Sequence, residues 1–138
     1  MVSLRRRAEQ FMLAGRMDEA LAVFENMLAD SPNDARAWSD VGWALYDLGR
    51  HDDAIRHLKR ALEIDPERHE AWTCIGMIQT DPAEAIRCFD KAIAIAPDHW
   101  GNWHLKSVAL EELGRVEEAD ACFERAKSLD PKVFASSG

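Results

Sequence analysis

The residues that could do chemistry in this chain are three cysteines, five histidines and two pairs of adjacent glutamates. Cys74, Cys88 and Cys122 lie far apart in the sequence, and the histidines form no His-x-x-x-His pair. Zinc sites commonly use closely spaced Cys-x-x-Cys or His-x-x-x-His ligands, and this chain has neither pattern. An odd number of scattered cysteines is typical of reduced thiols. The sequence therefore predicts no metal, no cofactor and free cysteines.

One nucleophilic pair is conceivable, Cys74 with His104, because a neighbouring histidine can activate a cysteine thiol. No orienting third group and no oxyanion donor accompanies this pair in the sequence. The adjacent glutamates are typical of solvated surfaces and not of acid-base catalysis; they are Glu111-Glu112 and Glu117-Glu118. We interpret the chain as non-catalytic and retain an enzyme as the third alternative, with Cys74 and His104 as its only conceivable site.

Composition and charge narrow the function classes. The chain has 138 residues, of which 47% are hydrophobic and 30% charged, which fits one folded domain. Its 17 basic and 25 acidic residues give a net charge of −8, which removes the general attraction to phosphate that nucleic-acid binders use. No apolar run approaches the ~18 residues of a membrane span, and no secretory signal follows the arginines at 5–7. We expect a cytoplasmic protein without nucleic-acid or membrane partners.

The elements that position these residues belong to an internal repeat of about 34 residues. Residues 35–68 and 100–133 align, with Trp38 opposite Trp103 and Gly49 opposite Gly114. A first copy spans residues 1–34, and a third spans 69–99 if three residues are missing before Ala85. The predicted array therefore covers residues 1–133, and residues 134–138 form a tail. We number positions within a repeat as offsets from its first residue, counting the gap in the third copy.

Each copy is predicted to form two helices joined by a turn, which makes the fold all-α. Glycine in the turn, as at Gly49, takes the left-handed conformation that ends helices. Offsets 4, 7, 8 and 11 of the first helix share one face, as a period of 3.6 residues requires. Small residues such as Gly42 and Ala54 allow the two helices to approach closely, and larger ones such as Leu58 fill the space around them.

This pattern resembles the tetratricopeptide repeat (TPR), with its recurrent large aromatic, Leu-Gly, aromatic, Ala, aromatic, Ala, Pro signature. About seven matched offsets recur in four copies and cover nearly the whole chain. The resemblance implies an α-solenoid of four stacked antiparallel helix pairs, wound as a right-handed superhelix whose inner surface is lined by the first helices. Offset 7 departs from the family pattern, because it is Arg7 in the first copy and Lys106 in the fourth.

The fourth copy has a polar outer face. Offsets 21 and 28, which face the next repeat, are aliphatic in the first three copies but become Asp120 and Lys127. A stacked neighbour would have to bury both charges, whereas a terminal repeat needs polar residues there. We therefore expect the array to stop at four repeats and the chain to be a complete small protein, the alternative being a truncated solenoid. Phe123 remains apolar at this end and is a candidate for weak homo-oligomer contacts.

The third copy replaces the Leu-Gly-Arg turn by Thr80-Asp81-Pro82, a helix cap followed by proline at the first helical position. Its first helix should therefore lose most of a turn. Two interpretations remain open. The change is either loop variation that the solenoid tolerates, or a device that opens the inner groove between the second and fourth copies.

The face of the first helices opposite the core is the candidate binding groove. Its residues are Arg5, Glu9, Arg36, Ser39, Asp40, Trp43, Tyr46, Asp47, Glu70, Thr73, Cys74, Met77, His104, Leu105 and Val108. An apolar strip along it, rimmed by charge, favours a protein contact, with Trp43 as the main anchor. The strip consists of Trp43, Cys74, Met77, Leu105 and Val108. The alternative is that some of these residues complete packing between repeats.

Some TPR proteins bind the C-terminal carboxylate of chaperone tails through lysine, asparagine and arginine at fixed inner offsets. Here those offsets carry Arg5, Glu9, Asp40, Glu70 and Cys74, whose carboxylates would repel such a ligand. We therefore predict a protein-protein interaction scaffold that binds an apolar peptide or protein segment in its concave groove. The alternative is a structural TPR module that self-associates into a homo-oligomer.

Overall fold

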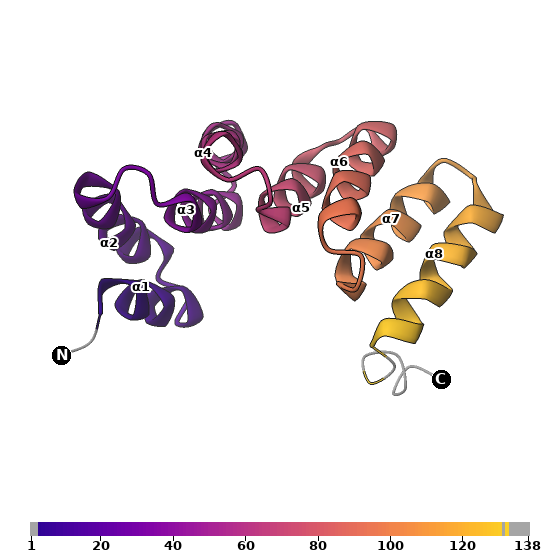
Figure 1. Ribbon diagram of the computed structural model, residues 1–138, viewed down its shortest axis with the longest axis horizontal. Helices are drawn as coiled ribbons and strands as arrows, with labels where there is room; N and C mark the ends of the chain where they lie inside the picture. The colour runs from indigo at the N-terminus through magenta and orange to yellow at the C-terminus, as the bar shows by residue number, and fades with distance from the viewer. Residues whose placement is uncertain (1–2, 131, 133–138) are drawn as a thin grey trace. The chain divides into compact units, whose positions relative to one another are not determined.

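The computed structural model describes residues 3–130 and 132, and these residues form eight α-helices (Figure 1). The helices are α1 (Leu4–Leu13), α2 (Met17–Asp30), α3 (Ala35–Asp47), α4 (His51–Ile64), α5 (His69–Ile78), α6 (Pro82–Ile95), α7 (Trp100–Glu112) and α8 (Val116–Leu129). They pack in sequential pairs, which confirms the all-α prediction. The expected tail, residues 134–138, lies outside the described residues.

In three of the pairs, a turn that contains glycine joins the two helices. Gly15, Gly49 and Gly114 have φ angles of +75°, +78° and +76°, a region that residues with a Cβ atom enter only at a cost. After α3, the Gly49 amide donates to the Tyr46 carbonyl and the next amide donates to the Leu45 carbonyl, both at 2.9 Å. These two bonds form a Schellman motif, which satisfies carbonyls that the helix end leaves open. The glycine prediction is confirmed at all three turns.

The third pair is connected differently, as the sequence predicted. Helix α5 has 10 residues, whereas α3 and α7 have 13 each, so α5 is shorter by most of a turn. Asp81 caps α6 by accepting a hydrogen bond from the Ala83 amide at 3.0 Å, and Pro82 occupies the first helical turn. Proline suits this position because a backbone N–H group there would have no partner within the helix, so its absence in proline costs no hydrogen bond.

In the second and third repeats, the close approach of the two helices of a pair depends on glycine at offset 8. A Cβ atom on Gly42 of α3 would lie 2.5 Å from the Leu58 Cγ atom of α4. A Cβ atom on Gly76 of α5 would lie 2.6 Å from the Phe89 Cε1 atom of α6. Leu58 is fully buried and Phe89 nearly so, which means that neither side chain has free space to move into.

Contacts between Cα atoms divide the chain into two compact units, Met1–Cys74 and Ile75–Gly138, whose boundary lies inside α5. In the first unit, α2 packs on α3, and the side chains of Phe24 and Leu58 are fully buried. In the second unit, α6 packs on α7 around a core of Ala85, Ile86, Phe89, Ala109, Leu110, Ala119 and Cys122. The expectation of one continuous superhelical array over residues 1–133 stays a prediction.

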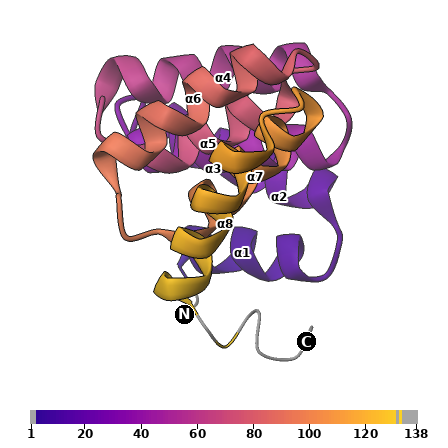
Figure 2. The same cartoon turned by 90° about the vertical axis from the view of Figure 1, so that its right-hand side faces the viewer.

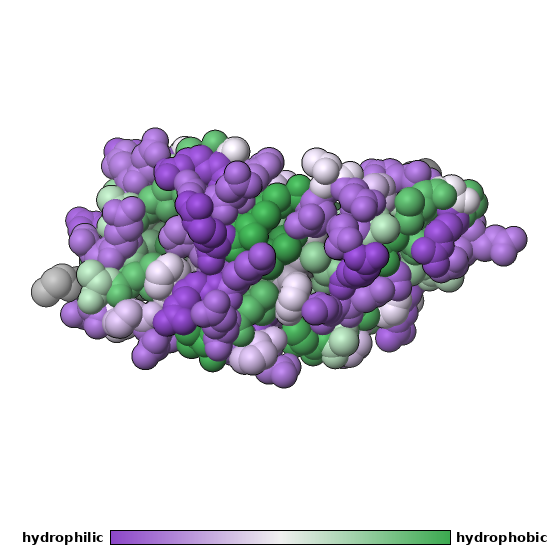
Figure 3. All heavy atoms as spheres, turned by 90° about the horizontal axis from the view of Figure 1, so that it is seen from above, coloured by the Kyte–Doolittle hydropathy of each residue, from purple (hydrophilic) through white to green (hydrophobic). Residues whose placement is uncertain are grey.

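The outer face of α8 is polar in the structure. Asp120 and Lys127 are both exposed, and α8 lies in front of α7 in Figure 2. Figure 3, which views the chain from above, shows hydrophilic side chains over most of that side, with hydrophobic areas between them. Within residues 3–130 and 132, no helix is both long and apolar enough to cross a bilayer.

The Gly42→Ala substitution tests the close approach of α3 and α4. Alanine is the better helix former by about 1 kcal/mol, but its Cβ atom overlaps Leu58, at a cost of about 1–3 kcal/mol for overpacking. We expect the free energy of unfolding, measured by urea denaturation, to fall. Gly101→Ala is the control because the nearest atom there is the Cε1 atom of the exposed His99 side chain at 3.0 Å, and it should cost less. A stabilised Gly42→Ala protein would contradict this packing account.

Candidate functional site

The predicted inner face of the first unit begins with an ion-pair network between α1 and α3. The Arg5 guanidinium lies 2.6 Å from an Asp40 carboxylate oxygen and 3.1 Å from an Asp34 oxygen. The other Asp34 oxygen accepts a hydrogen bond from the Ala37 amide at 3.1 Å, which caps α3. A single arginine therefore holds the helix cap and an inner-face carboxylate together.

The network continues outward through Arg36. Its guanidinium lies 3.1 Å from a Glu9 oxygen and 4.0 Å from an Asp40 oxygen, and both the Arg36 and Glu9 side chains are about half exposed. Burial raises the pKa of Asp40, while the charge and hydrogen bond of Arg5 and the charges of Arg36 and Arg68 act in the opposite direction. Both predicted inner-face arginines are thus already ion-paired.

An aromatic cluster lies further along α3. The Trp43 and Tyr46 rings meet edge to face with centroids 6.1 Å apart, and Tyr46 stacks on His51 of α4 at 5.6 Å. Trp43 and Tyr46 are half-buried, and the neighbouring Asp47 is exposed. Large rings held by one another and partly open to solvent are the type of surface that anchors a protein ligand.

The start of α5 contributes less accessible surface than predicted. The Glu70 carboxylate lies 3.3 Å from the Arg68 guanidinium and 2.8 Å from the His69 ring, so Glu70 is held at the helix start. Thr73 is buried, and its hydroxyl donates to the His69 carbonyl at 3.0 Å. Cys74 is fully buried, and burial together with the charge of Asp47 raises the pKa of its thiol to about 12.

The second unit holds the other predicted inner-face residues. Met77 and Leu105 are partly buried and pack against the core of the unit. The His104 ring lies 6.1 Å from the Trp100 ring, and the His104 carbonyl accepts a hydrogen bond from the buried Ser107 hydroxyl at 2.6 Å. Val108 is exposed and is the most accessible apolar residue of the predicted strip.

Three predicted groove residues are corrected by the structure. Ser39, Thr73 and Cys74 have 1%, 8% and 0% of their surface exposed, so they present almost no surface to a ligand on the inner face. Met77 and Leu105 combine partial exposure with core packing, which is the alternative that the sequence left open. A helix in a repeat is covered by its own partner and by its neighbours, so the accessible stripe is narrower than half of the wheel.

Sequence reasoning missed two contributors to the inner face, Asp34 and His51. The signal for Asp34 was its place just before α3, where aspartate commonly caps a helix. His51 lies in the next helix, five residues beyond Tyr46, and no local pattern showed that the two rings would stack.

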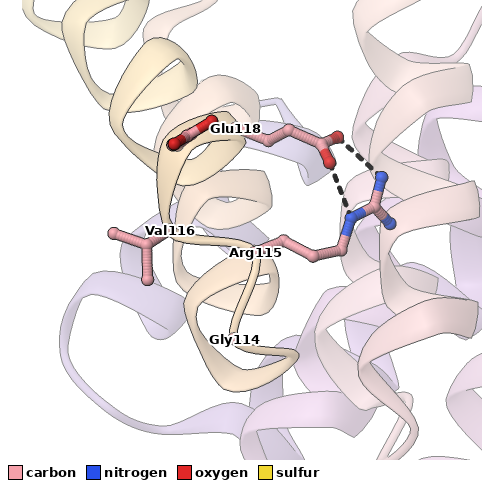
Figure 4. Close-up of a pocket in the computed structure, with 5 residues that line it drawn as sticks. Gly114, Arg115, Val116 and Glu118 are labelled. Carbon is pink, nitrogen blue, oxygen red and sulfur yellow. Dashed lines mark hydrogen bonds and ion pairs between the residues drawn. The ribbon is translucent and has the colours of Figure 1, made fainter.

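Figure 4 shows a shallow pocket of about 330 Å³ at the start of α8, lined by residues 114–118. The Arg115 and Glu118 side chains point toward one another and form two hydrogen bonds of 2.8 and 2.6 Å, while Val116 points away. The same spacing pairs Arg16 with Glu19 and Arg50 with Asp53. The feature is therefore part of the repeated helix start, and the charges of Arg115 and Glu118 are matched locally.

The described residues offer little support for covalent or metal chemistry. Burial raises the pKa of all three cysteine thiols, which keeps them protonated and poorly nucleophilic near neutral pH. Within residues 3–130 and 132, no group of three or more histidine, cysteine, aspartate or glutamate side chains is arranged to hold a metal ion.

Removing Arg5 should raise the pKa of Asp40 further, because the Arg5 charge stabilises the carboxylate. The pKa of Asp40 in the folded protein already lies above the ordinary 3.8. The contribution of Asp40 to the free energy of unfolding therefore falls as the pH rises from 3.8 through the folded-state pKa. The Arg5→Met variant should therefore lose about 1–2 kcal/mol at pH 7 and less in acid. NMR titration of the Asp40 carboxyl and urea denaturation measure both effects. Arg6→Met, an exposed neighbour, should change neither; an unchanged Asp40 pKa in the Arg5 variant would contradict the network.

Cys74 should resist alkylation in the folded protein. A thiol with a pKa of about 12 holds about a thousandfold less thiolate at pH 8 than one with the ordinary 9.0. Iodoacetamide labelling followed by peptide mapping should modify Cys74 only after urea is added. Modification of Cys74 in native protein at the rate of the unfolded chain would show an accessible, activated thiol and reopen the enzyme alternative.

Comparison with known proteins places this geometry in a family. Sequence profiles of the tetratricopeptide repeat match residues 11–78, 74–99 and 101–133. Protein FlbA of Caulobacter vibrioides is 34% identical over 110 residues, covering 78% of this chain and 18% of FlbA. BBSome complex member BBS4 of Xenopus tropicalis is 28% identical over 116 residues, covering 82% of this chain and 22% of BBS4. The chain thus spans about a fifth of the length of these two relatives.

Solved structures show the same fold. MamA from Desulfovibrio magneticus RS-1 is similar with a TM-score of 0.78 and 21% sequence identity, over 93% of this chain and 74% of the MamA chain. The repeat profiles, the glycine turns and the paired helices agree on one conclusion. The chain belongs to the tetratricopeptide repeat family.

Proposed function

We propose that this chain is a non-catalytic scaffold that binds a peptide or protein segment on the inner face of its first helices. TPR modules generally mediate protein-protein interactions, which gives the class of activity. Two relatives are named as members of assemblies: the BBSome complex member BBS4 and the anaphase-promoting complex subunit 3 of Schizosaccharomyces pombe. The identity of the ligand rests on the residues of this chain.

The observation that carries the proposal is the aromatic pair Trp43 and Tyr46 beside the exposed Asp47. Tryptophan and tyrosine supply most of the binding energy at many interfaces. Here each ring packs against the other in the absence of a ligand, which lowers the entropy lost on binding. Arg5 and Arg36 are ion-paired, so they offer little to an acidic ligand. A segment with an apolar side chain next to a lysine or arginine complements the rings and Asp47 best.

Capture from the source lysate tests this proposal. Immobilised wild-type protein should retain a partner that the Trp43→Ala, Val108→Glu double variant loses, because Trp43 is half-buried and Val108 is exposed on the predicted groove. Leu105 is left unchanged because it packs against the core. Trp43→Ala alone should weaken the affinity for the purified partner by about 2 kcal/mol or more, measured by calorimetry.

Val116→Glu is the matched control, since Val116 is 57% exposed at the start of α8 and lies outside the predicted groove. All variants must show the helical circular dichroism of the wild type. A partner retained equally by the double variant and the control would exclude the inner face as its binding site.

A further inference from the structure

The outer faces of α1 and α8 carry no neighbouring repeat among the described residues. Within each unit, the second helix of one repeat packs on the first helix of the next, α2 on α3 and α6 on α7. A small cavity of about 150 Å³ shows the register of the α2–α3 junction. Its walls include offsets 21, 25 and 28 of the first repeat and offsets 7 and 11 of the second, namely Leu21, Glu25, Leu28, Val41 and Leu45.

The α6–α7 junction uses the same register with a charge pair. Lys106, at offset 7 of the fourth repeat, places its Nζ atom 2.6 Å from an Asp90 carboxylate oxygen. Asp90 occupies offset 25 of the third repeat, four residues after Ile86 at offset 21. The Lys106 side chain is 22% exposed, so its apolar stem is packed while its charge reaches the carboxylate. A basic residue at offset 7 is therefore accommodated by an acidic residue at offset 25 of the preceding repeat.

The two outer faces carry the same pair of charges. Offset 7 of the first repeat is Arg7, and offset 25 of the fourth repeat is Glu124. Both are exposed, and neither forms an ion pair within residues 3–130 and 132. Asp120, at offset 21, adds a second exposed carboxylate to the α8 face. Arg7 and Lys106 are the two basic residues at offset 7, and each has an acidic counterpart at offset 25, one within the chain and one at its far end.

We infer that a second copy of this chain docks head to tail, with α1 of one copy on α8 of the other and Arg7 paired with Glu124. The contact reproduces the α6–α7 junction between molecules, with the Arg7–Glu124 pair in the place of Lys106–Asp90. It is heterologous, so it extends a chain of copies unless the rotation between copies closes a ring. Asp120 and Lys127 replace the aliphatic residues of internal junctions and would be desolvated in this contact. That cost makes the contact weaker than those within the chain.

Charge reversal at Arg7 and Glu124 tests the contact. Sedimentation equilibrium measures the average molar mass of the protein over a hundredfold range of protein concentration. Wild-type protein should show a mass that rises with concentration. The R7E and E124R variants should each associate about fivefold more weakly, because each places two like charges at the contact. An equimolar mixture of the two variants should regain association, since every contact between unlike copies again joins opposite charges.

Two substitutions elsewhere in the chain serve as controls for the change in net charge. R6E and E117R alter the net charge by the same amounts as R7E and E124R, but Arg6 and Glu117 occupy other offsets, so their association should match that of the wild type. Salt dependence alone does not discriminate, because salt also screens the repulsion between chains of net charge −8. A wild-type mass that stays monomeric, controls that weaken association equally, or a mixture no better than its components would each overturn the inference.

Discussion

The close approach of two helices at the small buried residue of offset 8, which is Ala8, Gly42, Gly76 or Ser107, is the constraint on which the rest of this structure depends. At Gly42 and Gly76 the neighbouring helix presents Leu58 and Phe89 so closely that a side chain on the glycine would overlap them. Because the two helices of a pair bury these side chains against each other, the pair cannot rotate without opening a cavity in a densely packed interior. This fixed geometry leaves the opposite side of the first helix available for binding.

Ion pairs on the exposed side of the first helices then determine which part of that surface is available to bind a ligand. In the first unit Arg5 and Arg36 are paired with Asp34, Asp40 and Glu9, and Asp40 bridges the two arginines. Their charges are already compensated, so displacing them costs a ligand about as much as it gains. The rings of Trp43 and Tyr46 carry no such competing interaction, which makes them the natural anchor for an apolar segment.

The sequence was sufficient for the repeat, its helices and its turns, because their steric requirements recur at fixed offsets. Gly49 and Gly114 could be assigned a left-handed conformation, and Asp81 with Pro82 a helix start, before the structure was known. The inner face was harder to predict. Ser39 and Cys74 lie at suitable angles on the helical wheel, yet they are buried, because a wheel ignores the neighbouring helices. The bond between Arg5 and Asp34 joins residues 29 positions apart, which no local pattern reveals.

NMR titration of the indole N–H groups tests the binding account most directly. The indoles of Trp38 and Trp103 donate to the carbonyls of Pro32 and Pro97, both at 2.8 Å, and so report on the intact fold. When a segment of the partner retained by the wild-type protein is added, the Trp43 indole resonance should shift to saturation while those two references stay in place. A Trp43 resonance that is unchanged when the segment is fully bound would contradict the account.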